Sequence, residues 1–222
     1  QSENRLSRMS AVTDAQLANP PAEDWLMWRG SYDSHGFSPL EQINRENVDQ
    51  LEQAWRVELG QGPNMATPLV HDGVMFLAST QDNVIALDAT SGEELWRYEH
   101  RPTAFASARM GVAIHDDKLI IPTQNMHVVA LEARTGEVVW DHAIETTLAG
   151  AVPYSLRGAP LVANGMVLQG VTATMIPEGG FIVGLDLETG NEVWRFHTVA
   201  RPDGPGGNTW NNLALSERSG GS

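Results

Sequence analysis

The chain has 222 residues, of which 41% are hydrophobic, enough to support a folded core rather than disorder. Its formal net charge of −14 disfavours nucleic acid and anionic membrane surfaces as partners, because both attract proteins rich in Lys and Arg. The absence of cysteine excludes disulfides, thiolate metal sites and a cysteine nucleophile, and no apolar run of about 20 residues is present to span a membrane.

The chain begins with a segment that differs from the rest. Residues 1–23 are polar and show little hydrophobic periodicity, so we expect a flexible N-terminal tail. Residues 24–222 are expected to form one β domain that begins near Asp24 and Trp25.

The domain contains a repeated pattern that ends in tryptophan. Trp55 ends a degenerate first copy, and three closer copies span residues 86–96, 130–140 and 184–194, each with an acidic residue, a glycine and a final Trp. A period of about 40–50 residues with β-rich content is typical of propeller blades, each of which is a four-stranded sheet. The repeat therefore predicts an all-β fold of about four blades.

Two apolar runs precede each of the three closer copies and predict the inner strands of the blade. The runs are joined by Asp72-Gly73 in the first copy, by Asp116-Asp117 in the second and by Asn164-Gly165 in the third. Asp-Gly and Asn-Gly between apolar runs are strong hairpin signals. Each repeated Trp is expected to wedge between neighbouring blades, where its ring would bury about 150–250 Å².

These residues resemble a known family. The pattern in residues 86–96 and its two further copies is the tryptophan-docking motif of quinoprotein alcohol dehydrogenases. The opening segment from Trp28-Arg29-Gly30 to Ala54-Trp55 and the closing segment from Phe196 to Trp210 are similar to the same family, so the resemblance covers residues 24–222. It implies that the blades are about half of an eight-bladed propeller.

The resemblance also implies a function. Members of the family hold pyrroloquinoline quinone (PQQ) on the propeller axis beside calcium or a lanthanide. They oxidise an alcohol by hydride transfer to the quinone, in the periplasm, and pass electrons to cytochrome c or a quinone. The family's catalytic base and stacking Trp would lie beyond residue 222. We therefore expect this N-terminal portion to be inactive alone, and a second chain or copy could complete the ring.

The resemblance places candidate cofactor contacts at Arg109, Thr172, Ala173 and Ser222, and a candidate metal ligand at Glu178. Arg157 stands where the family has a Thr and is a further candidate cofactor contact because of its charge. PQQ carries three carboxylates, so arginines and hydrogen-bond donors suit it. Calcium prefers carboxylate oxygens, which suits Glu178. The simpler alternative is that the arginines pair with surface carboxylates and that Glu178 is a solvated loop residue.

Two other functions stay open. Met65 stands where the family has Glu or Gln facing PQQ, and Met175 stands near the place of the metal-binding Glu. Both departures favour a propeller that binds no cofactor and serves as a scaffold or an envelope-assembly module. A complete four-bladed propeller is the third interpretation.

Overall fold

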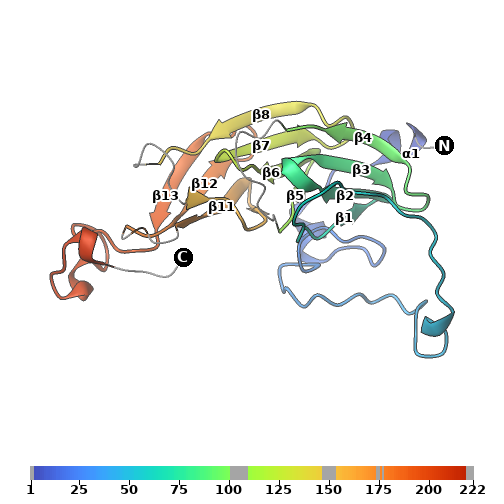
Figure 1. Ribbon diagram of the computed structural model, residues 1–222, viewed down its shortest axis with the longest axis horizontal. Helices are drawn as coiled ribbons and strands as arrows, with labels where there is room; N and C mark the ends of the chain where they lie inside the picture. Colours follow the sequence, from blue (N-terminus) through green and yellow to red (C-terminus); the bar gives the residue numbers. More distant parts are fainter. Residues whose placement is uncertain (1–2, 101–109, 147–153, 174–175, 177, 219–222) are drawn as a thin grey trace.

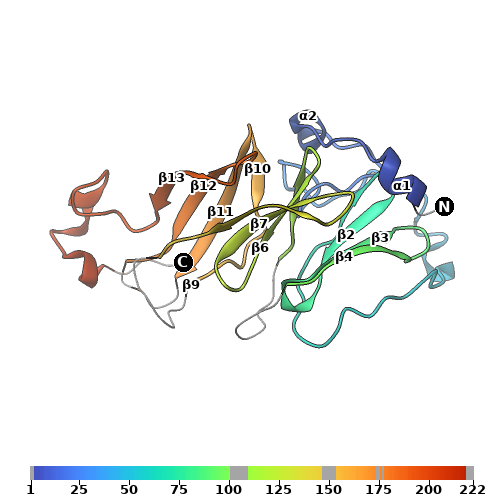
Figure 2. The same cartoon turned by 90° about the horizontal axis from the view of Figure 1, so that it is seen from above.

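The computed structural model describes residues 3–100, 110–146, 154–173, 176 and 178–218. Three antiparallel sheets stand side by side along an arc (Figure 1). Figure 2 shows the same three sheets from above, in chain order across the molecule. Each sheet has its four strands in chain order, which is the arrangement expected of a propeller blade.

The strands match the predicted hairpins. Blade 1 contains β1 (Leu69–His71), β2 (Val74–Ala78), β3 (Val84–Asp88) and β4 (Glu94–Tyr98); blade 2 contains β5 (Ala113–His115), β6 (Lys118–Pro122), β7 (His127–Glu132) and β8 (Val138–Ala143); blade 3 contains β10 (Leu161–Ala163), β11 (Met166–Ala173), β12 (Phe181–Asp186) and β13 (Glu192–His197). A two-stranded extension joins β9 (Tyr154–Ser155) to the end of β11. The helices are α1 (Glu3–Arg8), α2 (Asp14–Ala18) and the 3-10 turns Val48–Gln50, Thr80–Asp82, Gly207–Trp210 and Leu215–Glu217.

The all-β propeller prediction is confirmed, and the described residues form three blades where about four were expected, the third blade with β9 as a fifth strand. The difference lies at Trp55. The residues around Trp55 form no strand, so the degenerate first copy of the repeat does not correspond to a sheet.

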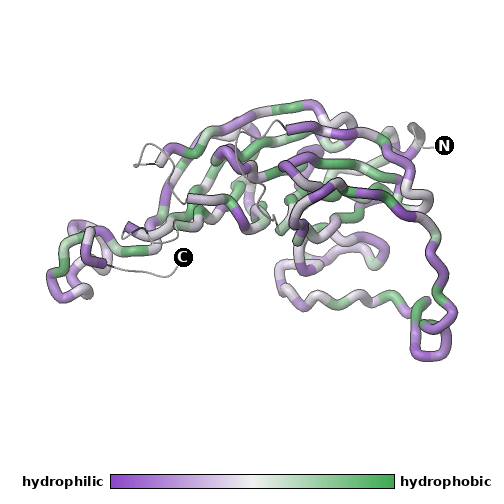
Figure 3. Tube along the Cα trace, viewed as in Figure 1, coloured by the Kyte–Doolittle hydropathy of each residue, from purple (hydrophilic) through white to green (hydrophobic). Residues whose placement is uncertain are grey.

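Hydrophobic side chains fill the two spaces between blades. In blade 2, Leu119 and Ile121 point to blade 1, whereas Ile120 and Val128 point to blade 3. Both faces of β6 in blade 2 are therefore covered, which is why this strand is buried at every position. Figure 3 shows the hydrophobic residues concentrated in the sheets, with hydrophilic residues alternating along the outermost strands.

The repeated tryptophans make the same contact three times. The indole Nε1 of Trp55 donates to the carbonyl of Ala89 at 3.1 Å, that of Trp96 to Ala133 at 3.0 Å, and that of Trp140 to Leu187 at 2.9 Å. Each ring also lies on the glycine of the next copy (Gly92, Gly136 and Gly190), where a Cβ atom would approach the ring to 2.7, 2.6 and 2.6 Å respectively. Every blade is thus joined to its neighbour by one indole.

The strand connections define two faces of the array. The short turns β1–β2, β3–β4, β5–β6, β7–β8, β10–β11 and β12–β13 lie at one end of the antiparallel strands, which we call the turn face. The connections β2–β3 and β6–β7, the described residues 176 and 178–180 between β11 and β12, and the residues 110–112 and 156–160 before β5 and β10 lie at the opposite end, which we call the loop face.

Residues 3–23, for which we expected a flexible tail, pack on the turn face. Met9, Val12 and Leu17 are buried in the core between blades 1 and 2. Val12 forms a β-bridge with Asp116 in the β5–β6 turn. Helix α2 begins with a capping box between Thr13 and Gln16, and both helices lie along one edge of the sheets in Figure 2. Three well-placed apolar side chains are enough to anchor an otherwise polar segment.

The ammonium group of Lys118 joins blades 2 and 3. Its Nζ lies 3.0 Å from Asp117 in its own blade and 3.1 Å from Glu188 in the β12–β13 turn. Burial opposes the charge, but hydrogen bonds to these two carboxylates raise the pKa of Lys118 above its usual value.

We expect Lys118→Met to lower the free energy of unfolding by about 1 kcal/mol at pH 7, since both carboxylate partners are solvent-accessible. A pKa raised in the folded state contributes stability fully below the unfolded value of about 10.4 and loses it at higher pH. Urea unfolding from pH 7 to pH 11 should therefore show the two proteins converging above about pH 10.4. Arg56→Met, at an exposed pair with Glu58, should change nothing.

Candidate functional site

The innermost strands are joined to one another at the loop face through main-chain atoms. The N–H of Thr67, before β1, donates to the carbonyl of Met110 at 3.1 Å, and the N–H of Met110, before β5, donates to the carbonyl of Arg157 at 3.1 Å. Thr67 and Gly111 form a parallel bridge. The three blades therefore converge on one point of the loop face, which we call the hub.

Three positions that the family resemblance singles out are equivalent in their sequence spacing to the innermost strands. Met65, Arg109 and Arg157 each lie four residues before the innermost strand of a blade, as β1, β5 and β10 begin at residues 69, 113 and 161. Arg109 lies outside the described residues. Met65 is 62% exposed, and Arg157 is exposed and makes no side-chain hydrogen bond or ion pair with the described residues. The main chain of Arg157 therefore lies at the hub, and its exposed guanidinium has no partner among the residues that the structure describes.

Thr172 and Ala173 lie at the same end of blade 3. They close β11, where Thr172 pairs with Ser155 and Ala173 with Tyr154, two and three residues before Arg157. Their side chains point to opposite faces of the strand. Ala173 is buried on the side of blade 2, whereas Thr172 is half-buried on the other side. Of the two, only Thr172 has a side chain that is partly accessible and can donate or accept a hydrogen bond.

The strand β9 that brings Ser155 to this place was missed in the sequence. A two-residue strand carries no periodicity of its own. The indirect signal is the length of the apolar run that forms β11, because its eight residues exceed the five of β2 and β6 and leave residues 169–173 without a partner in β10.

Glu178 lies in the β11–β12 connection on the loop face. Its side chain is half-exposed, and its carbonyl accepts a hydrogen bond from Arg201 Nη1 at 3.1 Å. Arg201 Nη2 lies 2.7 Å from His197 Nδ1. Burial, Arg201 and Arg195 lower the pKa of His197, in that order, so the imidazole is neutral and Nδ1 can accept.

Among the described residues, one group of three possible metal ligands comes close together, and it excludes Glu178. The group is Asp24, His71 and Asp72, on the turn face. Its atoms already satisfy one another, since His71 Nδ1 lies 2.8 Å from Asp24 and Nε2 lies 3.0 Å from the carbonyl of Ser10. The two ring nitrogens face opposite partners, so this group joins segments of chain and does not form a shared metal cage.

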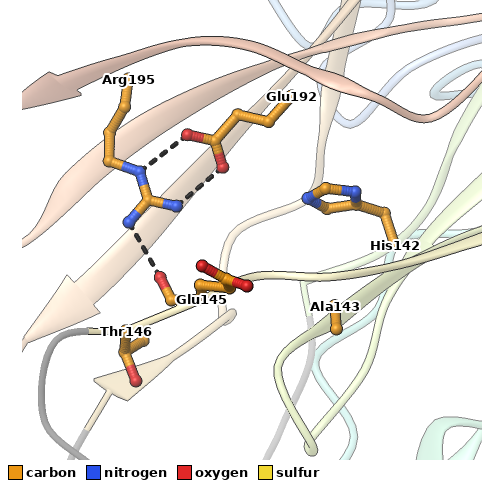
Figure 4. Close-up of a pocket in the computed structure, with 6 residues that line it drawn as sticks. All are labelled: His142, Ala143, Glu145, Thr146, Glu192 and Arg195. Carbon is orange, nitrogen blue, oxygen red and sulfur yellow. Dashed lines mark hydrogen bonds and ion pairs between the residues drawn. The ribbon is translucent and has the colours of Figure 1, made fainter.

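A cavity of about 580 Å³ lies between the outermost strands of blades 2 and 3. It is lined by His142, Ala143, Glu145, Thr146, Glu192 and Arg195 (Figure 4). Two hydrogen bonds of 2.8 and 2.7 Å join Arg195 to Glu192, and this contact lowers the pKa of Glu192 despite burial. The cavity belongs to β8 and β13, whereas the candidate cofactor residues belong to β10 and β11, so it is a separate feature.

The hub residues fit an anionic planar group in two respects. The guanidinium of Arg157 and the hydroxyl of Thr172 supply a cation and a donor. Beside them, Gly158 and Gly170 border open space, because a Cβ atom at either residue would meet no atom within 4 Å. Ser222 lies outside the described residues. Arg157 and Thr172 thus offer fewer hydrogen-bond donors than a ligand with three carboxylates would need. Such a ligand would need further donors from other residues.

Comparison with known proteins gives consistent results. The family profile for the PQQ-type "Glucose/ethanol/alcohol dehydrogenase, beta-propeller domain" matches residues 25–221. The quinohemoprotein alcohol dehydrogenase ADH IIB of Pseudomonas putida is 38% identical over 79% of this chain and 26% of its own length.

Two solved structures are similar. The quinohemoprotein alcohol dehydrogenase of Comamonas testosteroni has a TM-score of 0.76 and 29% identity, over 92% of this chain and 32% of its own. A europium-containing methanol dehydrogenase has a TM-score of 0.76 and 27% identity, over 86% of this chain and 34% of its own. This chain spans about a quarter to a third of the relatives it matches. None of its described helices has the length and apolar content to cross a bilayer.

Proposed function

Because this chain belongs to the PQQ β-propeller family of glucose, ethanol and alcohol dehydrogenases, we propose that it forms part of the cofactor-binding propeller of a quinoprotein alcohol dehydrogenase. The observation that carries the proposal is the hub, where the carbonyl of Arg157 closes the hydrogen-bonded row and its guanidinium has no partner among the described residues. A cation held by the backbone at the convergence of the blades suits a ligand with several carboxylates.

We propose distinct tasks for the residues around the hub. Arg157 pairs with a carboxylate of PQQ, and Thr172 donates a hydrogen bond to the same ligand. Arg109 and Ser222 are proposed further contacts on their sequence positions, and Ala173 contributes through its backbone. If bound, PQQ would supply the quinone that accepts a hydride from the alcohol, and Glu178 is the proposed oxygen ligand for a calcium or lanthanide ion that would polarise the quinone.

Activity is proposed to require further blades. The last of the four repeated tryptophans, Trp194, is 41% exposed. By contrast, Trp140 of blade 2, whose ring packs on blade 3, is 9% exposed. Phe196 on the same strand is 63% exposed. A face of this kind suits a neighbouring blade, supplied by further chain or by a second copy. The 222 residues alone are proposed to be inactive.

The cellular setting is proposed from the family resemblance. The substrate would be an alcohol, and the electron acceptor would be cytochrome c or a quinone. The location would be the periplasm. Fractionation of cells followed by detection of the protein would test the location.

The binding proposal is tested by titrating the whole protein with PQQ in the presence of Ca²⁺ and following absorbance. We expect saturable binding, and Arg157→Ala should weaken it about tenfold or more, because a charge-assisted contact contributes about 1.5–3 kcal/mol. Arg157→Lys should lose less. Arg97→Ala, at a pair with Glu94 on the outermost strand of blade 1, is the control and should bind normally. Absence of binding at tens of micromolar PQQ would favour the scaffold interpretation.

A further inference from the structure

Among the described residues, the polar atoms around the ring of His71 all act as hydrogen-bond acceptors. Nδ1 lies 2.8 Å from a carboxylate oxygen of Asp24, and Nε2 lies 3.0 Å from the carbonyl oxygen of Ser10. The hydroxyl of Ser10, 3.3 Å from Nε2, donates its own proton to Asp72 and so offers the ring a lone pair. Each ring nitrogen therefore faces a hydrogen bond that requires a proton.

The Asp24–His71 pair therefore holds two protons, whichever partner carries the one they share. An ionised Asp24 leaves an imidazolium ring, whereas a protonated Asp24 donates to Nδ1 and leaves the ring protonated at Nε2. In both forms the pair has no net charge. Loss of one proton leaves a negative charge on side chains that are 3% and 1% exposed, which burial makes unfavourable.

The surroundings of the pair offer no cation to balance that charge. Among the described residues, the other charged group in contact with the ring is Asp72, 3.4 Å from Nε2, and neither aspartate has an ion pair with Lys or Arg. Charged side chains on the neighbouring elements pair with one another instead: Arg5 of α1 with Asp88, Asp14 of α2 with His115, and Lys118 of β6 with Asp116. The second proton is therefore what keeps the buried pair neutral.

These contacts join the N-terminal segment to blade 1. The N–H and the hydroxyl of Ser10 donate to Asp72 at 2.7 and 2.9 Å, while His71 at the end of β1 holds the carbonyl of the same serine. A pair with one proton leaves a lone pair on one ring nitrogen, which then faces either that carbonyl or the carboxylate of Asp24. An attraction becomes a repulsion, so the docking of Ser10 depends on the proton.

We propose that the Asp24–His71 pair is a pH-dependent latch, which holds residues 3–23 on the turn face while it carries two protons and releases them when it loses one. The proposal is independent of the cofactor function. In the released state a solvated histidine loses its second proton near pH 6.5. Above this pH the docked state holds about one proton more than the released state, so docking weakens as the pH rises, by up to about tenfold per pH unit.

Asp72 limits the latch at the acid end. Burial raises its pKa, but hydrogen bonds from Ser10 and the charge of His71 outweigh burial and lower the pKa below its usual value of 3.8. A pKa lowered in the docked state contributes stability above 3.8 and loses it as the pH falls through the lowered value. Docking is therefore expected to be tightest between about pH 4 and pH 6.5.

The test follows hydrogen exchange in the whole protein from about pH 6 to pH 9, with each rate divided by the intrinsic rate at that pH. Protection of residues 3–23 should fall by up to about tenfold per pH unit above about pH 6.5, while protection of β6 stays constant as the internal reference. His71→Gln keeps a donor and an acceptor but cannot titrate in this range. Its residues 3–23 should be less protected, and their protection should not change with pH.

His115→Gln is the matched control, because His115 also pairs with a carboxylate of the N-terminal segment, that of Asp14, at 3.1 Å. It should keep the pH dependence of the unmodified protein. Protection of residues 3–23 that does not change with pH in the unmodified protein would overturn the latch, whether or not the variants fold. A pH dependence that persists in His71→Gln, or disappears in His115→Gln, would show that another group titrates and would overturn it too.

Discussion

Replacing Gly190 with alanine is expected to lower the free energy of unfolding by about 3 kcal/mol or more. The residue has φ +71°, a region that costs a non-glycine residue about 1–2 kcal/mol. Its new Cβ atom would lie 2.6 Å from two ring atoms of Trp140, which is 9% exposed between blades 2 and 3. Overpacking a fixed ring adds about 1–3 kcal/mol. Urea unfolding followed by tryptophan fluorescence would measure the loss.

Gly165→Ala is the matched control for this change. Gly165 has nearly the same backbone conformation, φ +72°, but a Cβ atom there would meet no atom within 4 Å. It should lose only the conformational part, about 1–2 kcal/mol. The difference between the two variants isolates the indole contact between blades. Equal losses would show that the tryptophan moves aside at little cost and that the indoles do not hold the array together.

Replacing Asp24 with alanine is expected to release residues 3–23 from the turn face, at a loss of about 3–5 kcal/mol. His71 is 1% exposed, and its Nδ1 has Asp24 as partner at 2.8 Å. The other oxygen of Asp24 accepts the N–H of Asp72 at 3.1 Å. The substitution leaves both groups without their acceptor, in a place that water reaches poorly. Thermal unfolding and hydrogen exchange over residues 3–23 would record it.

Asp14→Ala provides the comparison, since Asp14 also pairs a carboxylate of the N-terminal segment with a histidine. Its partner is His115 at 3.1 Å, but the carboxylate is 49% exposed. An exposed pair contributes about 0–1 kcal/mol, so this variant should keep residues 3–23 protected from exchange. If the two variants exchange alike, burial of the Asp24 contact is not what holds the segment.

Much of the fold could be predicted because its signals are local and repeated. Asp72-Gly73 and Asn164-Gly165 are two-residue turns that require positive φ angles, and the residue types alone are enough to predict them. The recurring Trp and Gly positions predicted contact between copies because a repeat buries its faces only against its neighbours. Trp55 shows the limit of this reasoning, since it makes the indole contact of the other copies while its own segment has no sheet.

The N-terminal segment could not be predicted for a different physical reason. Met9, Val12 and Leu17 follow no helical or strand period, and their burial depends on sockets formed by turns about 60–125 residues away. Composition alone favoured a tail there. The candidate site was only partly accessible to sequence reasoning. Resemblance pointed to Arg157 and Thr172, but the pairing with Ser155 that brings them to one end of blade 3 depends on tertiary contacts.

The row of hydrogen bonds from Thr67 to Met110 to Arg157 uses only peptide groups. Hydrogen bonds between peptide groups do not depend on which side chains the residues carry, except that proline has no N–H to donate. The side chains can therefore differ from blade to blade, as those of Thr67, Met110 and Arg157 do, without changing the hydrogen bonds that join the blades. In such an architecture the side chains at the hub can vary while the main-chain hydrogen bonds that join the blades stay the same.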